Sequence, residues 1–183
     1  MKIAYQGAPG AFGWEACRAF LPEWTPVARA TFAGVVKAVL AGKAARGILP
    51  LRNAIAGPVP GVEELIRESG LVVIDRHRLP IRMHLLGLAD ADLDQISQVM
   101  SHAVALAQCG RWIGESGMAT KEASNTALAA QALADSGDAT LGVIASEAAA
   151  DAYGLKILRR DVHDRDDNHT IFCVLARPDE AGA

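Results

Sequence analysis

Polar side chains and glycines gather at three points where a predicted strand runs into a predicted helix. These junctions are the glycine-rich loop 7–13, residues 101–103 and residues 123–126. Backbone N–H groups at a helix N-terminus favour negative charge, so each junction could bind part of a small anion. Ser, Thr and Asn also cap helices, and capping is the preferred interpretation for either of the last two junctions alone. Together the three predict an anion site of neutral donors, with these candidates: Ser101, Ser124, Asn125 and Thr126.

The other reactive residues argue against a metal centre and against a nucleophilic enzyme. Segment 161–169 is rich in Asp and His, but its spacing is irregular and no second ligand group accompanies it. Ser101, His102 and Asp164 form no recognisable catalytic triad. Cys109 is predicted on an apolar helix face, where a thiol packs rather than attacks. We therefore predict neither a bound metal nor a cofactor.

Composition indicates a folded globular protein. Of the 183 residues, 51% are hydrophobic and 21% charged, and the formal net charge of −3 makes nucleic acid and anionic membranes poor partners. No apolar stretch approaches the ~20 residues of a membrane span, and no signal-peptide pattern opens the chain. Three widely spaced cysteines are typical of buried thiols in a reducing compartment. We expect a cytoplasmic protein.

Short apolar strands alternate with helical patterns along the chain. Such β-α units predict an α/β fold with a mostly parallel sheet, and ligands at the carboxyl ends of its strands. Segment 71–88 is interpreted as one long bent strand that connects two lobes. The predicted strands are 2–6, 25–30, 47–51, 98–101, 118–123, 141–145, 156–158 and 169–176, and the predicted helices are 12–21, 32–41, 62–68, 104–113, 126–134 and 147–153.

Several segments, in the same order along the chain, resemble the catalytic domain of prephenate dehydratases. Lys2–Phe12 is similar to the family's opening strand and glycine loop, and Leu49–Gly57 to its Pro-Ile-Glu-Asn-Ser-x-x-Gly segment. Ser101–Cys109 is very close to Ser-His-Pro-Gln-Ala-Leu-x-Gln-Cys. Ala145–Leu155 resembles another typical stretch, and Asn168–Phe172 resembles Asn-x-Thr-Arg-Phe. The resemblance spans nearly the whole chain.

The resemblance implies two α/β lobes like those of periplasmic binding proteins, with the ligand held between them. The lobes would be residues 1–78 plus 162–183, and residues 79–161. The implied reaction converts a small dianionic substrate, prephenate or arogenate, to an aromatic product without a cofactor, in homodimers or homotetramers. Thr170 would assist departure of the substrate hydroxyl. The implied substrate-binding residues are Asn53, Arg52, Ser101, Gln108, Ser124, Asn125 and Thr126, with Phe172 packed beneath the site.

The chain also departs from the family pattern. Ile171 replaces the signature arginine, Arg52 replaces an acidic residue, and Ala54 replaces a serine. A charge-assisted hydrogen bond contributes roughly 1.5–3 kcal/mol, so losing an arginine should weaken dianion binding. We hypothesise that Arg52 restores the positive charge from another direction, in which case Arg52→Glu should impair binding.

Two alternatives stay open. One is a relative that decarboxylates prephenate without aromatising it, and the other is a non-catalytic module that binds small anions. We expect neither the family's usual regulatory module, which binds phenylalanine, nor its chorismate mutase domain in this chain. We therefore expect no strong inhibition by phenylalanine.

Overall fold

The computed structural model describes residues 1–180, and the chain folds into two compact units. The first unit contains Met1–Ala8, Phe12–Ile81 and the stretch from Asp167 onward. The second contains Pro9–Ala11 and Arg82–Asp166, so the chain changes units a few residues after the boundaries expected for the lobes. Within the described residues, no helix is both long and apolar enough to cross a membrane.

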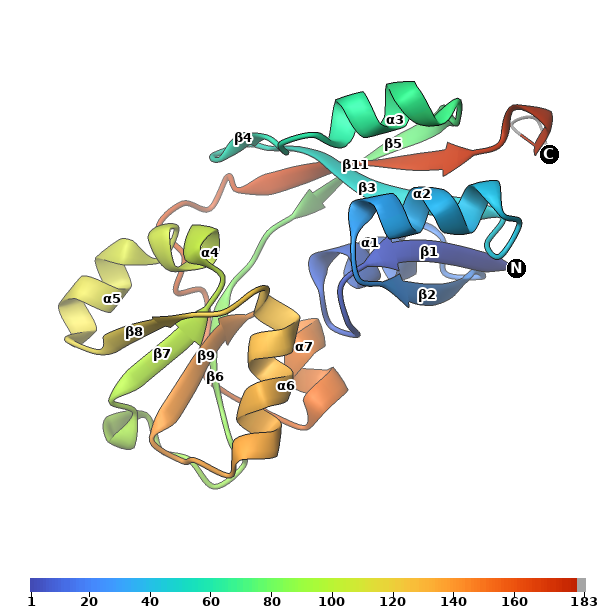
Figure 1. Ribbon diagram of the computed structural model, residues 1–183. Coiled ribbons are helices and arrows are strands. Elements are labelled where there is room, and N and C mark those ends of the chain that lie inside the picture. Colours follow the sequence, from blue (N-terminus) through green and yellow to red (C-terminus); the bar gives the residue numbers. More distant parts are fainter. Residues whose placement is uncertain (181–183) are drawn as a thin grey trace. The chain divides into compact units, whose positions relative to one another are not determined.

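A mixed sheet forms the centre of the first unit (Figure 1). Its strands are β1 (Lys2–Gln6), β2 (Thr25–Arg29), β3 (Arg46–Asn53), β4 (Gly57–Pro58), β5 (Val72–Pro80) and β11 (His169–Ala176). They follow the order β2-β1-β3-β11-β5, and β4 pairs with the end of β3. The pairs β1–β2 and β1–β3 are parallel, whereas β11 runs antiparallel to both β3 and β5. The helices of this unit are α1 (Phe12–Phe20), α2 (Phe32–Leu40), α3 (Val62–Ser69) and a 3₁₀ turn at Pro178–Glu180.

Helices cover both faces of this sheet. One apolar cluster joins α2 and α3 to the sheet, and it includes Val35, Ile66 and Leu175. The opposite face carries Tyr5, because side chains alternate along a strand, and Gly13 of α1 packs against the Tyr5 ring. The neighbours β3 and β11 therefore have one face under α2 and α3, and the other on the side of α1.

The second unit has its own mixed sheet. Its strands are β6 (His84–Gly87), β7 (Gln98–Ser101), β8 (Ala119–Glu122), β9 (Leu141–Ala145) and β10 (Lys156–Arg159), in the order β10-β6-β9-β7-β8. Its helices are a 3₁₀ turn (Leu93–Gln95), α4 (Ala103–Ala107), α5 (Gly110–Ser116), α6 (Thr126–Ser136) and α7 (Glu147–Tyr153). An apolar cluster that includes Met100, Leu133 and Ala149 joins α6 and α7 to one face of the sheet.

Three predictions about the elements are wrong in part. The sheets are mixed rather than mostly parallel, because β11 returns antiparallel between β3 and β5, and β6 runs antiparallel to β9 and β10. Segment 71–88 is two strands, since β5 pairs in the first sheet and β6 in the second. The predicted helix 104–113 is α4 followed by α5. Asp164 stabilises this break, because its N–H donates to the Gln108 carbonyl (2.8 Å) and its carboxylate accepts from the Arg111 N–H (3.2 Å).

Candidate active site

Asn53 and Thr170 lie directly opposite each other on β3 and β11. The Asn53 amide nitrogen donates to three neighbouring oxygens: the Thr170 hydroxyl at 3.0 Å, the Asn168 side-chain oxygen at 2.9 Å and the His169 carbonyl at 3.0 Å. Thr170 is 8% exposed and Asn168 3% exposed. The strand pairing thus assembles a sheltered polar cluster from residues more than a hundred positions apart.

The other end of the Asn53 amide fixes its orientation. Its oxygen accepts the backbone N–H groups of Ile55 (3.0 Å) and Ala56 (2.9 Å), in the tight turn that leads from β3 into β4. A flipped amide would place N–H groups against N–H groups there, and oxygen against three acceptors on the other side. The donor end of Asn53 must therefore point at Thr170.

This orientation decides what the Thr170 hydroxyl can do. Because its oxygen already accepts a hydrogen from Asn53, its own hydrogen is directed elsewhere. Among the described residues, no group accepts that hydrogen. The arrangement presents Thr170 as a hydrogen-bond donor, and a hydroxyl that also accepts a bond is a stronger donor through polarisation.

Packed aromatic rings lie beside Thr170 on the same face of the sheet. Phe172 follows two residues later on β11, so its side chain emerges on the Thr170 face, and it is 2% exposed. His77 pairs with Phe172 across β5 and β11, and its ring stacks on Phe20 of α1 at a centroid distance of 4.4 Å. These rings form a rigid, apolar environment beside Thr170. Its low local dielectric strengthens the hydrogen bonds made there.

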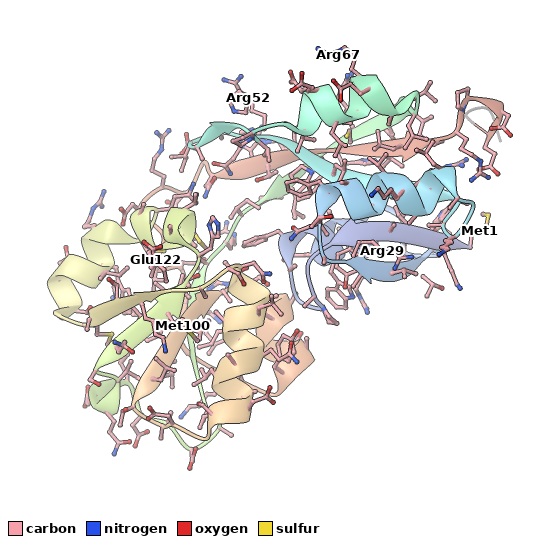
Figure 2. All side chains as sticks on the ribbon, in the orientation of Figure 1. Met1, Arg29, Arg52, Arg67, Met100 and Glu122 are labelled. Atoms are coloured by element: carbon pink, nitrogen blue, oxygen red, sulfur yellow. The ribbon has the colours of Figure 1, made fainter. Side chains whose placement is uncertain are left out.

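Arg52 lies on the other face of the sheet. It pairs with Ile171 on β11, and both residues are one position away from the Asn53–Thr170 pair. Side chains alternate along β11, so Ile171 emerges with Cys173 on the α2 and α3 side, and Arg52, its partner beyond an irregularity in the β3–β11 register, emerges there too. Figure 2 shows the Arg52 side chain on the side of the sheet where α3 carries Arg67. The structure therefore places Arg52 on the opposite face of the sheet from Asn53 and Thr170, and a role for its charge in substrate binding stays a prediction.

Ser101 is buried at the end of β7 rather than presented by a helix. It is 0% exposed, and its hydroxyl donates to the Ile144 carbonyl on β9 at 2.6 Å. The residue that caps α4 is His102, whose Nδ1 accepts the Val104 N–H at 3.2 Å. The Ser101 hydrogen is thus used within the sheet, and a substrate-binding role for Ser101 stays a prediction.

The third predicted junction begins α6. Asn125 caps this helix, because its side-chain oxygen accepts the Leu128 N–H at 2.8 Å. Ser124 is exposed before the cap, and Thr126 is the half-buried first residue of the helix. Helix capping therefore explains Asn125, and roles for Ser124 and Thr126 in binding an anion stay predictions.

Gln108 and Cys109 occupy the break between α4 and α5. Gln108 is half-buried and ends α4, and a role for it in substrate binding stays a prediction. Cys109 is wholly buried between the two helices rather than on one helix face. Burial, with the Asp164 charge as the smaller cause, raises the pKa of the Cys109 thiol to about 12. A thiolate nucleophile is therefore disfavoured there.

The Asp- and His-rich segment after β10 is used for local structure. Nδ1 of His84 accepts the Asp161 N–H at 2.9 Å, and Nδ1 of His163 accepts the Met83 N–H at 3.3 Å. Asp164 caps α5, as described above. Within residues 1–180, no group of three or more His, Cys, Asp or Glu side chains is arranged to hold a metal ion.

Asn168 is a polar residue of the cluster that sequence reasoning did not select. It precedes β11, its side-chain oxygen accepts from Asn53, and its carbonyl accepts the Ile81 N–H at 3.0 Å. The Asn-x-Thr spacing was its only signal in the sequence. A polar residue just before a strand usually belongs to a turn, and only the register of β3 against β11 shows that Asn168 contacts Asn53.

The sequence matches the prephenate dehydratase family over residues 3–180, and the chain therefore belongs to that family. A bifunctional N-acyl-homoserine lactone acylase/prephenate dehydratase of Komagataeibacter europaeus is 37% identical over 96% of this chain and 62% of its own length. Prephenate dehydratase of Bacillus subtilis is 33% identical over 98% of this chain and 65% of its own length. An arogenate dehydratase/prephenate dehydratase of Arabidopsis thaliana is 33% identical over 97% of this chain and 45% of its own. The chain thus spans about half to two thirds of these relatives.

Solved structures confirm the fold class. Prephenate dehydratase of Arthrobacter aurescens, solved in complex with L-Phe, superposes with a TM-score of 0.90 at 24% identity, over 97% of this chain and 61% of that chain. A nutrient-binding protein of Burkholderia cenocepacia bound to methionine gives a TM-score of 0.53 at 9% identity, over 98% of this chain and 86% of that chain. At these identities the likeness concerns the fold alone. The protein has two α/β lobes that are similar in fold to those of periplasmic binding proteins.

Proposed function

We propose that this protein catalyses the decarboxylative dehydration of prephenate, or of its amino analogue arogenate, with Thr170 as the donor to the departing hydroxyl. The observation that carries the proposal is the Asn53–Thr170 hydrogen bond, which leaves the Thr170 hydrogen directed away from Asn53. Membership of the prephenate dehydratase family supports the reaction class. No cofactor is needed, because aromatisation of the substrate ring drives the reaction.

The step that most needs help from the protein is departure of the substrate's 4-hydroxyl group. The bond between the ring and its carboxylate breaks and carbon dioxide departs, while the bonding electrons move into the ring. The 4-hydroxyl then leaves, and one proton converts it to water, so the dianion gives a monoanionic aromatic acid, carbon dioxide and water. A threonine hydroxyl is too weak an acid to supply that proton outright. Thr170 stabilises the departing oxygen by a positioned hydrogen bond and relays a proton from water.

Residues of both units are proposed to bind the substrate. In the first unit these are Asn53 and Thr170, with Phe172 packed beneath. In the second unit the proposed contacts are made by Ser101, Gln108, Ser124, Asn125 and Thr126. Arg52 is also proposed to contribute positive charge toward the anionic substrate, so Arg52→Glu should weaken substrate binding. An unchanged affinity would remove Arg52 from the binding set.

We further propose that the protein works in the cytoplasm as a homodimer or homotetramer. The three free, buried cysteines support a reducing compartment. Sedimentation velocity of the purified chain measures the assembly, and a monomer at micromolar concentration would remove that part of the proposal.

The product distinguishes dehydration from the alternatives. Purified protein is mixed at neutral pH with prephenate, and separately with arogenate, and the aromatic product and carbon dioxide are followed. Aromatic product together with carbon dioxide supports the proposal, and the faster substrate identifies the preference. Carbon dioxide without aromatic product indicates the non-aromatising decarboxylase. Tight binding without turnover of either substrate indicates an anion-binding module.

N-acyl-homoserine lactone acylase activity is a second candidate, which the 37% identity with the Komagataeibacter europaeus protein favours. The buried serines of the second unit offer it no activated nucleophile, because Ser101 and Ser146 donate to backbone carbonyls. Release of a fatty acid from an acyl-homoserine lactone, measured beside the prephenate assay, tests this candidate.

A further inference from the structure

We propose that Asn168 is a positioning residue that directs the Asn53 amide, and through it the Thr170 hydroxyl. This proposal deepens the dehydratase function proposed above and rests on it. Asn168 does not touch the reacting atoms itself but acts through Asn53.

Acceptor oxygens outnumber the hydrogens of the Asn53 amide. The Asn53 amide nitrogen carries two hydrogens, and three acceptor oxygens lie within 3.0 Å of it. One of those oxygens, the His169 carbonyl, also accepts the Ala54 N–H at 2.8 Å. The two hydrogens are therefore distributed among competing acceptors. The plane of the amide decides how well one of them is aimed at Thr170.

Asn168 contributes the shortest of the three contacts, at 2.9 Å. Its side chain is almost completely buried, and its carbonyl is fixed by the Ile81 N–H at the end of β5. A buried amide oxygen favours a donor within hydrogen-bond distance, so the Asn168–Asn53 bond is favoured. By holding one amide hydrogen, Asn168 sets the twist of the amide and leaves the other hydrogen to the Thr170 side.

The position of Asn168 in the chain adds to its role. The chain re-enters the first unit at Asp167, and it leaves that unit after Ile81. Asn168 bonds to Ile81 through its backbone and to Asn53 through its side chain. It therefore fixes the start of β11, and with it Thr170 two residues later, to both neighbouring strands.

Two substitutions separate the Asn168 acceptor from the rest of the side chain. Asn168→Leu keeps the branched shape of the side chain but has no acceptor, whereas Asn168→Asp keeps an oxygen toward Asn53. In the leucine variant kcat should fall about tenfold with KM changed less than threefold, because the substrate still binds but the hydroxyl is less well aimed. The aspartate variant should recover most of kcat while KM rises, because the new charge repels an anionic substrate.

A double-variant cycle tests whether Asn168 acts through Thr170. On a Thr170→Val background the hydroxyl is absent, so Asn168→Leu should lower kcat by less than about twofold further. Losses that multiply in the double variant would overturn the proposal, and so would an unchanged kcat in the single Asn168→Leu variant.

Ser69→Ala is the matched control for stability. The Ser69 hydroxyl donates to the Ile66 carbonyl at 2.7 Å and accepts the Leu71 N–H, at the end of α3. Loss of the Ser69 hydroxyl in Ser69→Ala should lower the melting temperature, while kcat stays at the parent value. Equal kcat losses in Ser69→Ala and Asn168→Leu would show that general destabilisation is the cause, and would overturn the proposal.

A readout without turnover keeps this test separate from the proposed function. The side-chain amide hydrogens of Asn53 are identified by NMR from the signals that vanish in Asn53→Asp, and their exchange with water is measured. Faster exchange in Asn168→Leu supports the positioning contact even if the parent protein makes no aromatic product, which would refute only the dehydratase function. Unchanged exchange would overturn the role of Asn168.

Discussion

Replacing Asn53 with aspartate reverses the hydrogen bond on which the proposed chemistry depends. The substitution keeps the shape of the side chain and its oxygen toward Ile55 and Ala56. It removes the donor and places a carboxylate oxygen about 3 Å from the three acceptors that the amide nitrogen now serves. The Thr170 hydroxyl can respond by turning its own hydrogen toward Asp at position 53, and the Asn168 amide can respond by turning over, whereas the His169 carbonyl cannot donate.

The magnitude follows from what is lost. Removing one preorganised donor from a reacting oxygen costs about 10²–10³ in kcat, or about 2.7–4 kcal/mol, and we expect this range for Asn53→Asp. The three donor contacts contribute roughly 1 kcal/mol each to stability. A total of about 2–3 kcal/mol lowers the melting temperature of a domain of this size by roughly 4–12 °C.

The pH dependence of the variant gives a specific signature. Neighbouring acceptor oxygens disfavour the charged carboxylate, so the pKa of Asp at position 53 should lie above its ordinary range. As the pH falls, the protonated acid donates again and Thr170 is released. The kcat of Asn53→Asp should therefore recover toward acid pH, relative to the parent protein.

The assay is steady-state formation of the aromatic product from prephenate between about pH 5 and 8, a range in which most native domains are stable. Ala54→Asp is the matched control, because it adds the same charge at the exposed neighbouring position and leaves the Asn53 contacts in place. It should raise KM and leave kcat unchanged. The reasoning is refuted if kcat of Asn53→Asp stays within twofold of the parent, or if Ala54→Asp reduces kcat equally.

Three further predictions concern stability and reactivity. Gly10→Ala should destabilise by about 2–5 kcal/mol, because Gly10 has φ +81° and a Cβ would lie 2.5 Å from the Ala149 Cα, whereas Gly154→Ala at φ +65° in open space should cost about 1–2 kcal/mol. Equal losses in chemical denaturation would contradict the clash. Burial lowers the pKa of His84 below 6.5, against the opposing Asp161 charge, so the unfolded chain binds this proton first and stability falls as pH drops below 6.5. His84→Asn keeps an acceptor for the Asp161 N–H and should flatten that acid limb of the melting temperature, and an unchanged slope would exclude His84 as its cause. Thiol reagents at pH 8 should modify the cysteines only after unfolding, because burial raises their pKa values, and fast labelling of the folded protein would contradict their burial. These thiols are Cys17 and Cys109, at about 12, and Cys173, at about 11.

Local patterns predicted much of the fold. Strands 98–101 and 169–176 have the predicted bounds, because each is an apolar run with polar residues at or just beyond its ends. The position of β11 between β3 and β5 could not be predicted in this way, since pairing between distant segments leaves no local period. The break between α4 and α5 was missed for the same reason, because Asp164, which stabilises it, comes more than fifty residues later.

The candidate site shows the same division. The motif resemblance selected Thr170 and Asn53, and the register of β3 and β11 places them in hydrogen-bond contact. The same register puts Arg52 on the opposite face, which sequence spacing alone did not reveal because the strand pairing was unknown. It also brings in Asn168, whose contact with Asn53 depends on strand pairing rather than on any motif.

The most direct test of the central claim is kcat for aromatic product formation by Thr170→Val beside Thr170→Ser. Valine keeps the branched shape without a hydroxyl, and serine keeps the hydroxyl without the methyl group. If Thr170 donates to the departing oxygen, the valine variant loses at least about a hundredfold in kcat, and the serine variant stays within about tenfold of the parent. A valine variant that forms aromatic product at the parent rate would contradict the account.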